Sequence, residues 1–353
     1  MDCFVLNSAF ANVDVIDIFE SLLWTERYSS CGDFELYMAT NTKSVNLLAG
    51  ECFLAIGESE QVMVVESLEI KSDPEGGSHT IAKGRSLESI LDRRIIWTQT
   101  TLTGNLQLAI KRLLDENAIS PTNTSRKIPG LTFLASTDPA VTTHTVDAQF
   151  TGDNLYTAIK DLCDSAGIGF KITLSANDTP VFQLYSGTNR TYDQLLNPQV
   201  TFSPSFENLA SSNYFESRQP LKTVTLIGGE GEGSARRYAT AGVASGLDRR
   251  ELFTDARDIS SLVDGVTIPP ATYLNQLLQR GLEKLAEAVK VSAFDGDADP
   301  AGMYVYGQDF FMGDDVQIAN EYGLAAASRV TEYIRSHSTS GAKAYPTFTP
   351  IET

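Results

Sequence analysis

NLQLAIKRLLD at residues 105–115 and NLYTAIKDLCD at residues 154–164 are the two segments that decide the architecture of the middle of this chain. Asparagine, leucine, alanine, isoleucine, lysine and aspartate stand at matching positions in both. Apolar residues recur at i, i+3, i+4, i+7 and i+8, the pattern of an amphipathic helix. Asn105 and Asn154 precede the apolar positions and are suited to cap the helix N-termini. The apolar sets are Leu106, Ala109, Ile110, Leu113 and Leu114, and Leu155, Ala158, Ile159, Leu162 and Cys163.

Each predicted helix is followed by a short run typical of a strand, Leu131–Leu134 after the first and Phe170–Leu174 after the second. We interpret the pattern as two related helix-then-strand units in one α/β domain, residues 98–197, whose amphipathic helices cover a small sheet. The alternative is that two helix-forming segments resemble each other by coincidence.

Strand patterns lie on both sides of this domain. Short apolar or alternating runs at Glu35–Ala39, Cys52–Ile56 and Val62–Ile70, with turn signals between them, predict a meander or barrel within residues 1–97. The strand pattern returns at Pro198–Ser203 and Thr223–Ile227, and again toward the C-terminus. The chain is therefore predicted to be α+β, with β structure at both ends.

A long helix is predicted to start at Pro269-Pro270, because proline is well tolerated at the first helical position. It falls within residues 236–301, which are otherwise polar and weakly patterned. The predicted apolar face consists of Leu274, Leu277, Leu278, Leu285, Ala286 and Val289.

The composition limits the classes of function. The chain has 353 residues, 42% of them apolar, which suits two or three domains of about 150 residues. Its 45 acidic and 27 basic side chains give a net charge of −18. Such a surface repels phosphate backbones, so we expect no groove that grips nucleic acid, although nucleic acid could slide past it. No segment approaches the roughly 20 apolar residues of a membrane helix, and MDCFVLNSAF lacks the basic start of a secretory signal, so no membrane insertion is expected.

The residue types that usually carry catalysis are sparse. Cys3, Cys31, Cys52 and Cys163 stand singly, which predicts buried, reduced thiols and neither a zinc site nor a disulfide framework. The histidines at 79, 144 and 337 have no partner at a ligand or triad spacing. Gly242–Gly246 (GVASG) places its serine one position late for a nucleophile elbow. We therefore predict no catalytic, cofactor-binding or metal-binding residues, and no enzyme.

Three further motifs partly match the sequence patterns of known functional sites. Gly228–Gly233 (GGEGEG) follows a predicted strand, but its GxGxG spacing and two glutamates do not suit a pyrophosphate, so a flexible or tightly turned connector is predicted. Asp295–Asp299 (DGDAD) begins like a calcium loop, yet Pro300 and Tyr306 occupy the positions that need glycine and a bidentate acid. A solvated acidic turn is predicted there, with weak ion binding left open. Asp314-Asp315 would point to opposite faces of a strand and form no acid/base pair.

Several phrases occur in a fixed order along nearly the whole chain. They are Trp24–Tyr28 with Gly32–Leu36, Gly84–Leu87 with Leu91–Ile96, the glycine-rich run ending at Arg236, Tyr306–Asp309 with Met312–Val316, Arg329–Glu332, and Tyr345–Phe348. Together they resemble the tail-hub family of long-tailed bacteriophages, which includes the structural N-terminal module of tail-associated lysins. A peptidase or muramidase domain would need about a hundred further residues, so no lysin activity is expected.

The resemblance implies a homotrimeric hub of a phage tail tip, or baseplate. Each subunit would supply two β-barrel domains related to the tail-tube fold, so three subunits would adapt a sixfold tube to a threefold tip. The first barrel would span residues 1–97 and the second residues 198–235 and 302–353, with a helix-containing insertion at 236–301. The implied partners are the distal tail protein or tail tube, the tape-measure protein, and tip, fibre or receptor-binding proteins. Phage DNA would pass through without specific binding. The protein would be made in the host cytoplasm and carried in the virion.

Two other functions remain open. A carbohydrate-binding tip protein that recognises the host would need a cluster of exposed aromatic side chains, and the aromatic residues are scattered along the chain. A cryptic cell-wall hydrolase would have to work with acidic residues alone, given the placement of the histidines.

Overall fold

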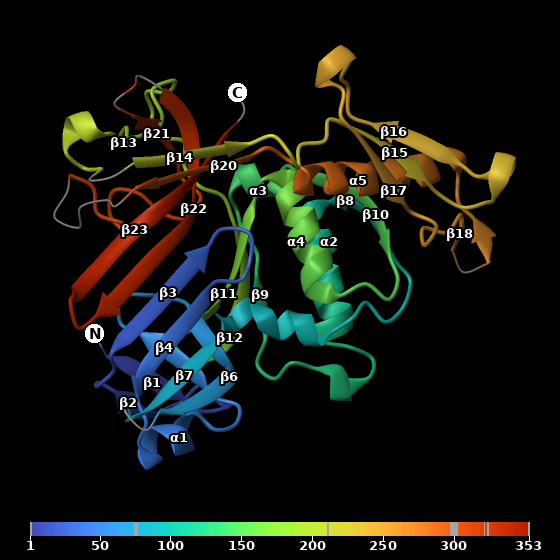
Figure 1. Cartoon of the computed structure of the whole chain (residues 1–353). Coiled ribbons are helices and arrows are strands. Elements are labelled where there is room, and N and C mark those ends of the chain that lie inside the picture. The colour runs from blue at the N-terminus through green and yellow to red at the C-terminus, as the bar shows by residue number, and fades with distance from the viewer. Residues whose placement is uncertain are drawn as a thin grey trace.

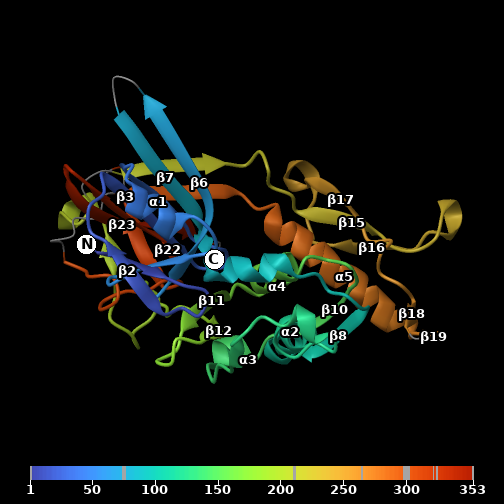
Figure 2. The ribbon, with the colours of Figure 1, turned by 90° about the horizontal axis from the view of Figure 1, so that it is seen from below.

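The computed structural model describes residues 2–73, 77–209, 212–263, 265–296, 303–320, 322 and 325–351. Residues 74–76, and Asp297 and Asp299 of the predicted acidic turn, lie outside the described residues. Strands predominate over helices along the chain, so the predicted α+β class is confirmed (Figure 1). The large sheet lies at one end of the molecule, a small three-stranded sheet lies at the other, and helices lie between them (Figure 2).

The large sheet contains thirteen strands among the described residues and draws on both ends of the chain. Its main path is β14-β20-β23-β22-β3-β4-β7-β6-β5-β1-β2, and β13 and β21 branch from β22. The hydrogen-bonded path is open from β14 to β2. The strands are β1 Cys3–Leu6, β2 Asn12–Ile16, β3 Ser21–Arg27, β4 Asp33–Ala39, β5 Phe53–Ile56, β6 Val62–Asp73, β7 Gly77–Ser86, β13 Thr201–Phe202, β14 Ser212–Ser217, β20 Val291–Gly296, β21 Asp315–Ala319, β22 Ala325–Ser338 and β23 Gly341–Pro350.

Two hydrophobic clusters lie against this sheet. The first surrounds Trp24, which is fully buried, and is built from alternate residues of the N-terminal strands together with Leu48 of helix α1 (Thr42–Leu48). The second surrounds Phe202 and Phe348 and is built mainly from residues after 199. Each fully buried large apolar side chain contributes about 1.5–3 kcal/mol, so each cluster is a substantial core.

Both predicted helices of the middle domain are present, α2 at Leu106–Leu114 and α4 at Leu155–Ala166. The Asn105 side chain accepts the backbone N–H of Leu108, and the Asn154 side chain accepts that of Thr157, so both predicted N-caps are confirmed. In each of the two helices a lysine forms an ion pair with the aspartate four residues later. These pairs are Lys111–Asp115 and Lys160–Asp164.

A strand precedes each of these helices, which the sequence did not reveal. β8 (Thr100–Asn105) leads into α2, β10 (Thr145–Phe150) leads into α4, and the two strands pair with each other in antiparallel fashion. The predicted strands after the helices are β9 (Thr132–Leu134) and β11 (Gly169–Leu174), which flank β12 (Pro180–Tyr185). Each unit is thus strand–helix–strand.

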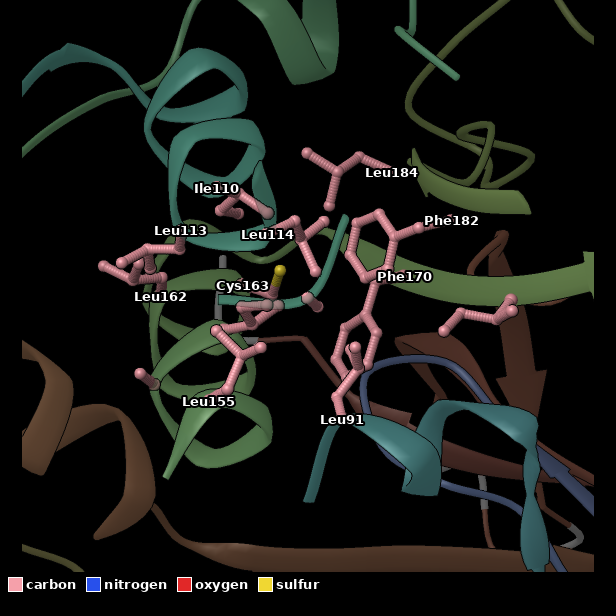
Figure 3. Packing of buried hydrophobic residues seen from close by; sticks show 14 of the residues in the cluster. Leu91, Ile110, Leu113, Leu114, Leu155, Leu162, Cys163, Phe170, Phe182 and Leu184 are labelled. Carbon is pink, nitrogen blue, oxygen red and sulfur yellow. The ribbon is translucent and has the colours of Figure 1, made fainter. Parts of the chain in front are cut away.

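The helices α2 and α4 contribute their apolar faces to a common core (Figure 3). Ile110, Leu113 and Leu114 of α2 face Leu155, Leu162 and Cys163 of α4, and Phe170 and Phe182 lie beside them. The rings of Phe170 and Phe182 are stacked with their centroids 5.9 Å apart. This cluster also includes Leu87 and Leu91 of the 3₁₀ helix η1 (Leu87–Arg93).

The three-stranded sheet at the far end of the molecule has the order β16-β15-β17, and α5 (Pro270–Glu287) covers one of its faces. Pro270 is the first residue of α5, as predicted. The apolar face was only partly predicted, because Tyr273 and Leu277 pack on the sheet whereas Leu274 is 44% exposed. β15 lies in the segment assigned to the second barrel, but it pairs with β16 and β17. The strands are β15 Val224–Gly228, β16 Tyr238–Ala241 and β17 Glu251–Asp255, with a nearby hairpin of β18 Leu262–Val263 and β19 Val266–Thr267.

Candidate functional site

The candidate functional site is one face of the large sheet, and it depends on the pairing of β3 with β22. β3 comes from the start of the chain and β22 from its end. In their antiparallel register Arg27 stands opposite Glu332 and Thr25 opposite Ile334. This pairing makes the strands from β14 to β6 one continuous wall.

At β3 and β4 one face of the wall lies against the protein core and the other face carries mainly polar side chains. In β3 the side chains of Leu22 and Trp24 belong to the core, so the alternate residues Leu23 and Thr25 point the other way. In β4 Phe34 and Leu36 belong to the core, and Glu35 points away from it. We call the side of the wall opposite the core the polar face.

Lys83 of β7 and Arg27 of β3, both on the polar face, are paired with acidic residues on neighbouring strands. Lys83 binds Glu35 at 2.5 Å from the strand alongside. Arg27 binds Asp33 at 2.6 Å and Glu332 at 2.5 Å, so it bridges three strands. Such cross-strand pairs contribute little stability when half exposed, but they reduce the local charge. Lys83 with Glu35 is neutral, and Arg27 with its two acids carries one net negative charge, so the acidity of the chain is reduced where these pairs lie.

On the core side of the seam, Glu26 and Arg335 form an ion pair that is nearly buried. The Ser59 hydroxyl donates to Glu26 at 2.6 Å and the Tyr306 hydroxyl donates to it at 3.2 Å. Tyr306 and Tyr333 are stacked with centroids 3.8 Å apart, and the Arg335 guanidinium lies 4.7 Å from the Tyr333 centroid. Burial raises the pKa of Tyr306, and the negative charge of the nearby Glu26 carboxylate raises it further. The cluster borders a cleft of about 590 Å³ and holds the two ends of the chain together.

Tyr28 lies where β3, β11 and the segment before β21 meet. Its hydroxyl donates to the carbonyl of Gly167 at 3.2 Å, and its own carbonyl accepts the N–H of Phe170. A Cβ atom at Gly169 would lie 2.5 Å from the Tyr28 ring, and one at Gly313 would lie 2.3 Å from it. Burial raises the pKa of the Tyr28 phenol to about 12. Glycine is therefore required at both positions, because each backbone lies against the Cδ2–Cε2 edge of this ring.

The histidines and cysteines, the residue types that most often carry catalysis, do not form a common cluster among the described residues. His79 stacks on Tyr37 and lies 3.1 Å from Glu20, whereas His337 packs edge-on against Phe19. All four cysteines are buried and free, and burial raises the pKa of Cys3 and Cys31 to about 12. Among the residues that the structure describes, no three ligating side chains come together in a way that could hold a metal ion.

Asp314 and Asp315 bind different partners, as their adjacent positions suggested. Asp314 is buried, accepts from Arg190 at 2.6 Å, and caps the backbone N–H groups of Thr188 and Phe311. Asp315 binds Arg329 at 2.8 Å. Both carboxylates are engaged in structural contacts.

The glycine-rich stretch is the turn between β15 and β16. Gly231 and Gly233 have positive φ angles of 98° and 56°, which favour glycine. Arg236 folds back over Gly228, where a Cβ atom would lie 2.6 Å from its guanidinium, and binds Asp255 at 2.7 Å. The predicted tight connector is confirmed, and its glycines make room for an arginine.

The interactions that unite the site could not be found from the sequence. Glu26 and Arg335 lie in segments with ordinary strand patterns. The glycines Gly169 and Gly313 were visible, but nothing in the sequence showed that both face Tyr28.

The fold resembles those of several solved phage tail proteins. It is similar to prophage tail protein gp18 from Listeria monocytogenes EGD-e, with 15% identity, a TM-score of 0.56, and coverage of 99% of this chain and 94% of that one. It is also similar to the 43 kDa tail protein of prophage MuSo2 from Shewanella oneidensis, with 11% identity, a TM-score of 0.60, and coverage of 99% and 98%. A tail protein from Neisseria meningitidis MC58 matches at 13% identity, a TM-score of 0.56, and coverage of 98% and 95%.

Residues 2–348 match the model of the Siphovirus ReqiPepy6 Gp37-like protein family, and the chain belongs to that family. The predicted membership of a phage tail-tip family is confirmed. No curated protein sequence matches the chain. No helix within the described ranges combines the length and apolar composition needed to cross a membrane.

Proposed function

We propose that this chain is the structural hub of a phage tail tip, a homotrimer whose subunits form a ring around a channel. The observation that carries the proposal is the seam between β3 and β22, which joins strands from both ends of the chain into one wall. The N-terminal strands around Trp24 and the later strands around Phe348 would each correspond to one tube-like barrel domain. Three such chains would present six related sheet segments, which suits contact between a sixfold tube and a threefold tip.

The polar face of the wall would line the channel. Its charge pairs, such as Lys83 with Glu35 and Arg27 with Asp33, leave neither a basic track that would hold DNA nor an apolar track that would hold protein. DNA and the tape-measure protein would therefore pass without being retained. Because Arg27 also binds Glu332, these pairs carry one net negative charge, so the lining would be weakly acidic and would repel phosphate only mildly.

The distal tail protein or the tail tube would bind one rim of the ring, and tip, fibre or receptor-binding proteins would bind the other. The protein would be made in the host cytoplasm and incorporated into the virion. We propose no catalytic role, because the described acidic clusters serve as ion pairs and caps. A clear band in cell-wall zymography with the purified protein would contradict that part of the proposal.

The decisive experiment is a reconstruction of assembled tails without imposed symmetry. Three copies in a closed ring, in contact with the distal ring of the tail, are expected at the tip. Six copies, or a single copy, would rule out the hub. Trimerisation of the isolated protein is a weaker test, because ring closure can require the neighbouring proteins.

A further inference from the structure

Trp97 is an exposed aromatic residue that contacts Arg126 and Asn117. It is 64% exposed, whereas the other tryptophan, Trp24, is fully buried. The Arg126 guanidinium carbon lies 4.8 Å from the centroid of the Trp97 ring, close enough to cover one of its faces. The backbone N–H of Trp97 donates to the Asn117 side chain at 3.2 Å. The ring is thus held in place with much of its surface open to solvent.

A polar pocket of about 580 Å³ adjoins this ring, within the roughly 300–1,000 Å³ range of small-molecule sites. Its charged side chains are balanced, two arginines against two acids. It contains hydroxyl, amide, carboxylate and guanidinium groups but few apolar side chains besides Trp97. The lining residues are Trp97, Thr98, Gln99, Arg112, Asp115, Glu116, Asn117, Ser120, Thr122, Asn123 and Arg126.

One wall of the pocket is a π-helical turn, Asp115–Ile119, at the end of α2. Such turns are rare and occur frequently at functional sites. The matching end of α4 has no such turn and closes at Gly167 in the left-handed conformation. The strand–helix–strand repeat therefore does not require the π-helical turn, which is particular to the pocket.

The π-helical turn places Asn117 as the organising residue of the pocket. Asn117 is only 2% exposed, and its amide nitrogen donates to the carbonyl of Leu113 at 3.0 Å. Its amide oxygen accepts both the N–H of Trp97 and the guanidinium of Arg126 at 3.2 Å. Trp97 and Arg126 are thereby pre-positioned, which lowers the entropic cost of binding a ligand.

We propose that this pocket binds a neutral saccharide. An open tryptophan face packs against the C–H face of a sugar ring, and planar carboxylate, amide and guanidinium groups bond its hydroxyls. The balance of Arg112 and Arg126 against Asp115 and Glu116 disfavours a strongly charged ligand such as a phosphate or a polyamine. One exposed aromatic ring would take the place of the cluster of aromatic side chains expected of a carbohydrate-binding protein. The site belongs to the single chain and does not depend on the hub arrangement.

The two tryptophans make a direct binding test possible. The isolated protein would be screened against neutral oligosaccharides of hexoses and N-acetylhexosamines, and the strongest one titrated while tryptophan fluorescence and its quenching by acrylamide are followed. Because Trp24 is buried, acrylamide reports on Trp97. A saturable fluorescence change with protection from quenching is expected.

Matched variants separate the pocket from a general surface effect. Trp97→Ala is expected to weaken binding at least tenfold, and Trp97→Phe to weaken it less while abolishing the fluorescence change. Leu247→Ala, a change at a 99% exposed residue elsewhere, should leave the affinity unchanged. The proposal is overturned if no oligosaccharide binds, or if Trp97→Ala and Leu247→Ala bind the sugar as tightly as the unaltered protein. Neither result would alter the copy number in assembled tails.

Discussion

The guanidinium of Arg335 donates to the carboxylate of Glu26, although 309 positions separate the two residues in the sequence. The side chain of Arg335 is 12% exposed and that of Glu26 is 9% exposed. The pair lies beside the seam of β3 and β22, and so connects the two ends of the chain.

Removal of one partner from this pair should destabilise the fold. Arg335→Met leaves the Glu26 carboxylate buried without its counter-charge, and a broken buried pair typically costs ~3–5 kcal/mol. Urea unfolding should show the corresponding loss in the free energy of unfolding. The control is Arg249→Met, which removes a more exposed pair with Glu251 and should cost at most about 1 kcal/mol. Equal effects of the two changes would contradict the structural role of Glu26 and Arg335.

The contact between Gly169 and Tyr28 predicts a steric effect. Gly169→Ala would place a methyl group 2.5 Å from the Tyr28 ring and 2.8 Å from its carbonyl oxygen. Such overpacking typically costs ~1–3 kcal/mol. Gly57→Ala is the matched control, because a Cβ atom there has no neighbour within 4 Å. A thermal unfolding midpoint that falls for Gly169→Ala but not for Gly57→Ala is expected.

The interface of α5 with α4 should respond to pH through Glu283. Burial raises the pKa of its carboxyl from 4.5 to about 7, and Arg280 lowers it only in part. Burial and the neighbouring Glu287 also raise the pKa of Asp161 on α4. The charged groups around this interface are Arg280, Lys284 and Glu287 on α5, Lys160, Asp161 and Asp164 on α4, and Asp153 and Asp258 nearby.

Between about pH 4.5 and 7 the folded state therefore binds more protons at Glu283 than the unfolded state does. The free energy of unfolding should fall as the pH rises through this window, by roughly 3 kcal/mol from this group. Glu283→Gln should flatten that part of the profile and stabilise the protein at pH 8. Glu251→Gln, at an exposed carboxylate, should leave the profile unchanged. A Glu283→Gln profile parallel to that of the unaltered protein would disprove the assignment.

Charge reversal on the polar face should slow DNA passage if that face lines the channel. Glu35→Lys combined with Glu69→Lys would leave Lys83 and Lys71 without their counter-charges. Assembled tails should eject DNA at least tenfold more slowly at low salt and recover at high salt, because the added contacts are electrostatic. Glu58→Lys with Glu251→Lys introduces the same charges away from this face. Equal ejection rates in the two pairs of variants would exclude the polar face as the lining.

The sequence predicted local features well. Leu106 to Leu114 and Leu155 to Cys163 carry a complete helical period with an asparagine before it, and both the helices and their caps are present. The strands before them were missed because β8 and β10 acquire their partner only by pairing with each other. The apolar face of α5 was misjudged at Leu274, since the sheet that selects the buried face lies far away in the sequence.

The pocket beside Trp97 was less predictable. The absence of catalytic motifs limited the class of function, but Trp97 and Asn117 could not be connected from their positions in the sequence. The π-helical turn that brings them together departs from the regular helical period, and such a turn has no sequence pattern of its own.

By itself the sequence determined the α+β class, the two related helix-then-strand units and the acidic net charge, because periodicity and capping act over a few residues and composition does not depend on position. Only the tertiary structure decided that β3 pairs with β22 and that Glu26 binds Arg335. It also decided that Gly169 and Gly313 both lie against the ring of Tyr28. These depend on the register of strands hundreds of residues apart, which is set by the packing of whole faces and not by any local pattern.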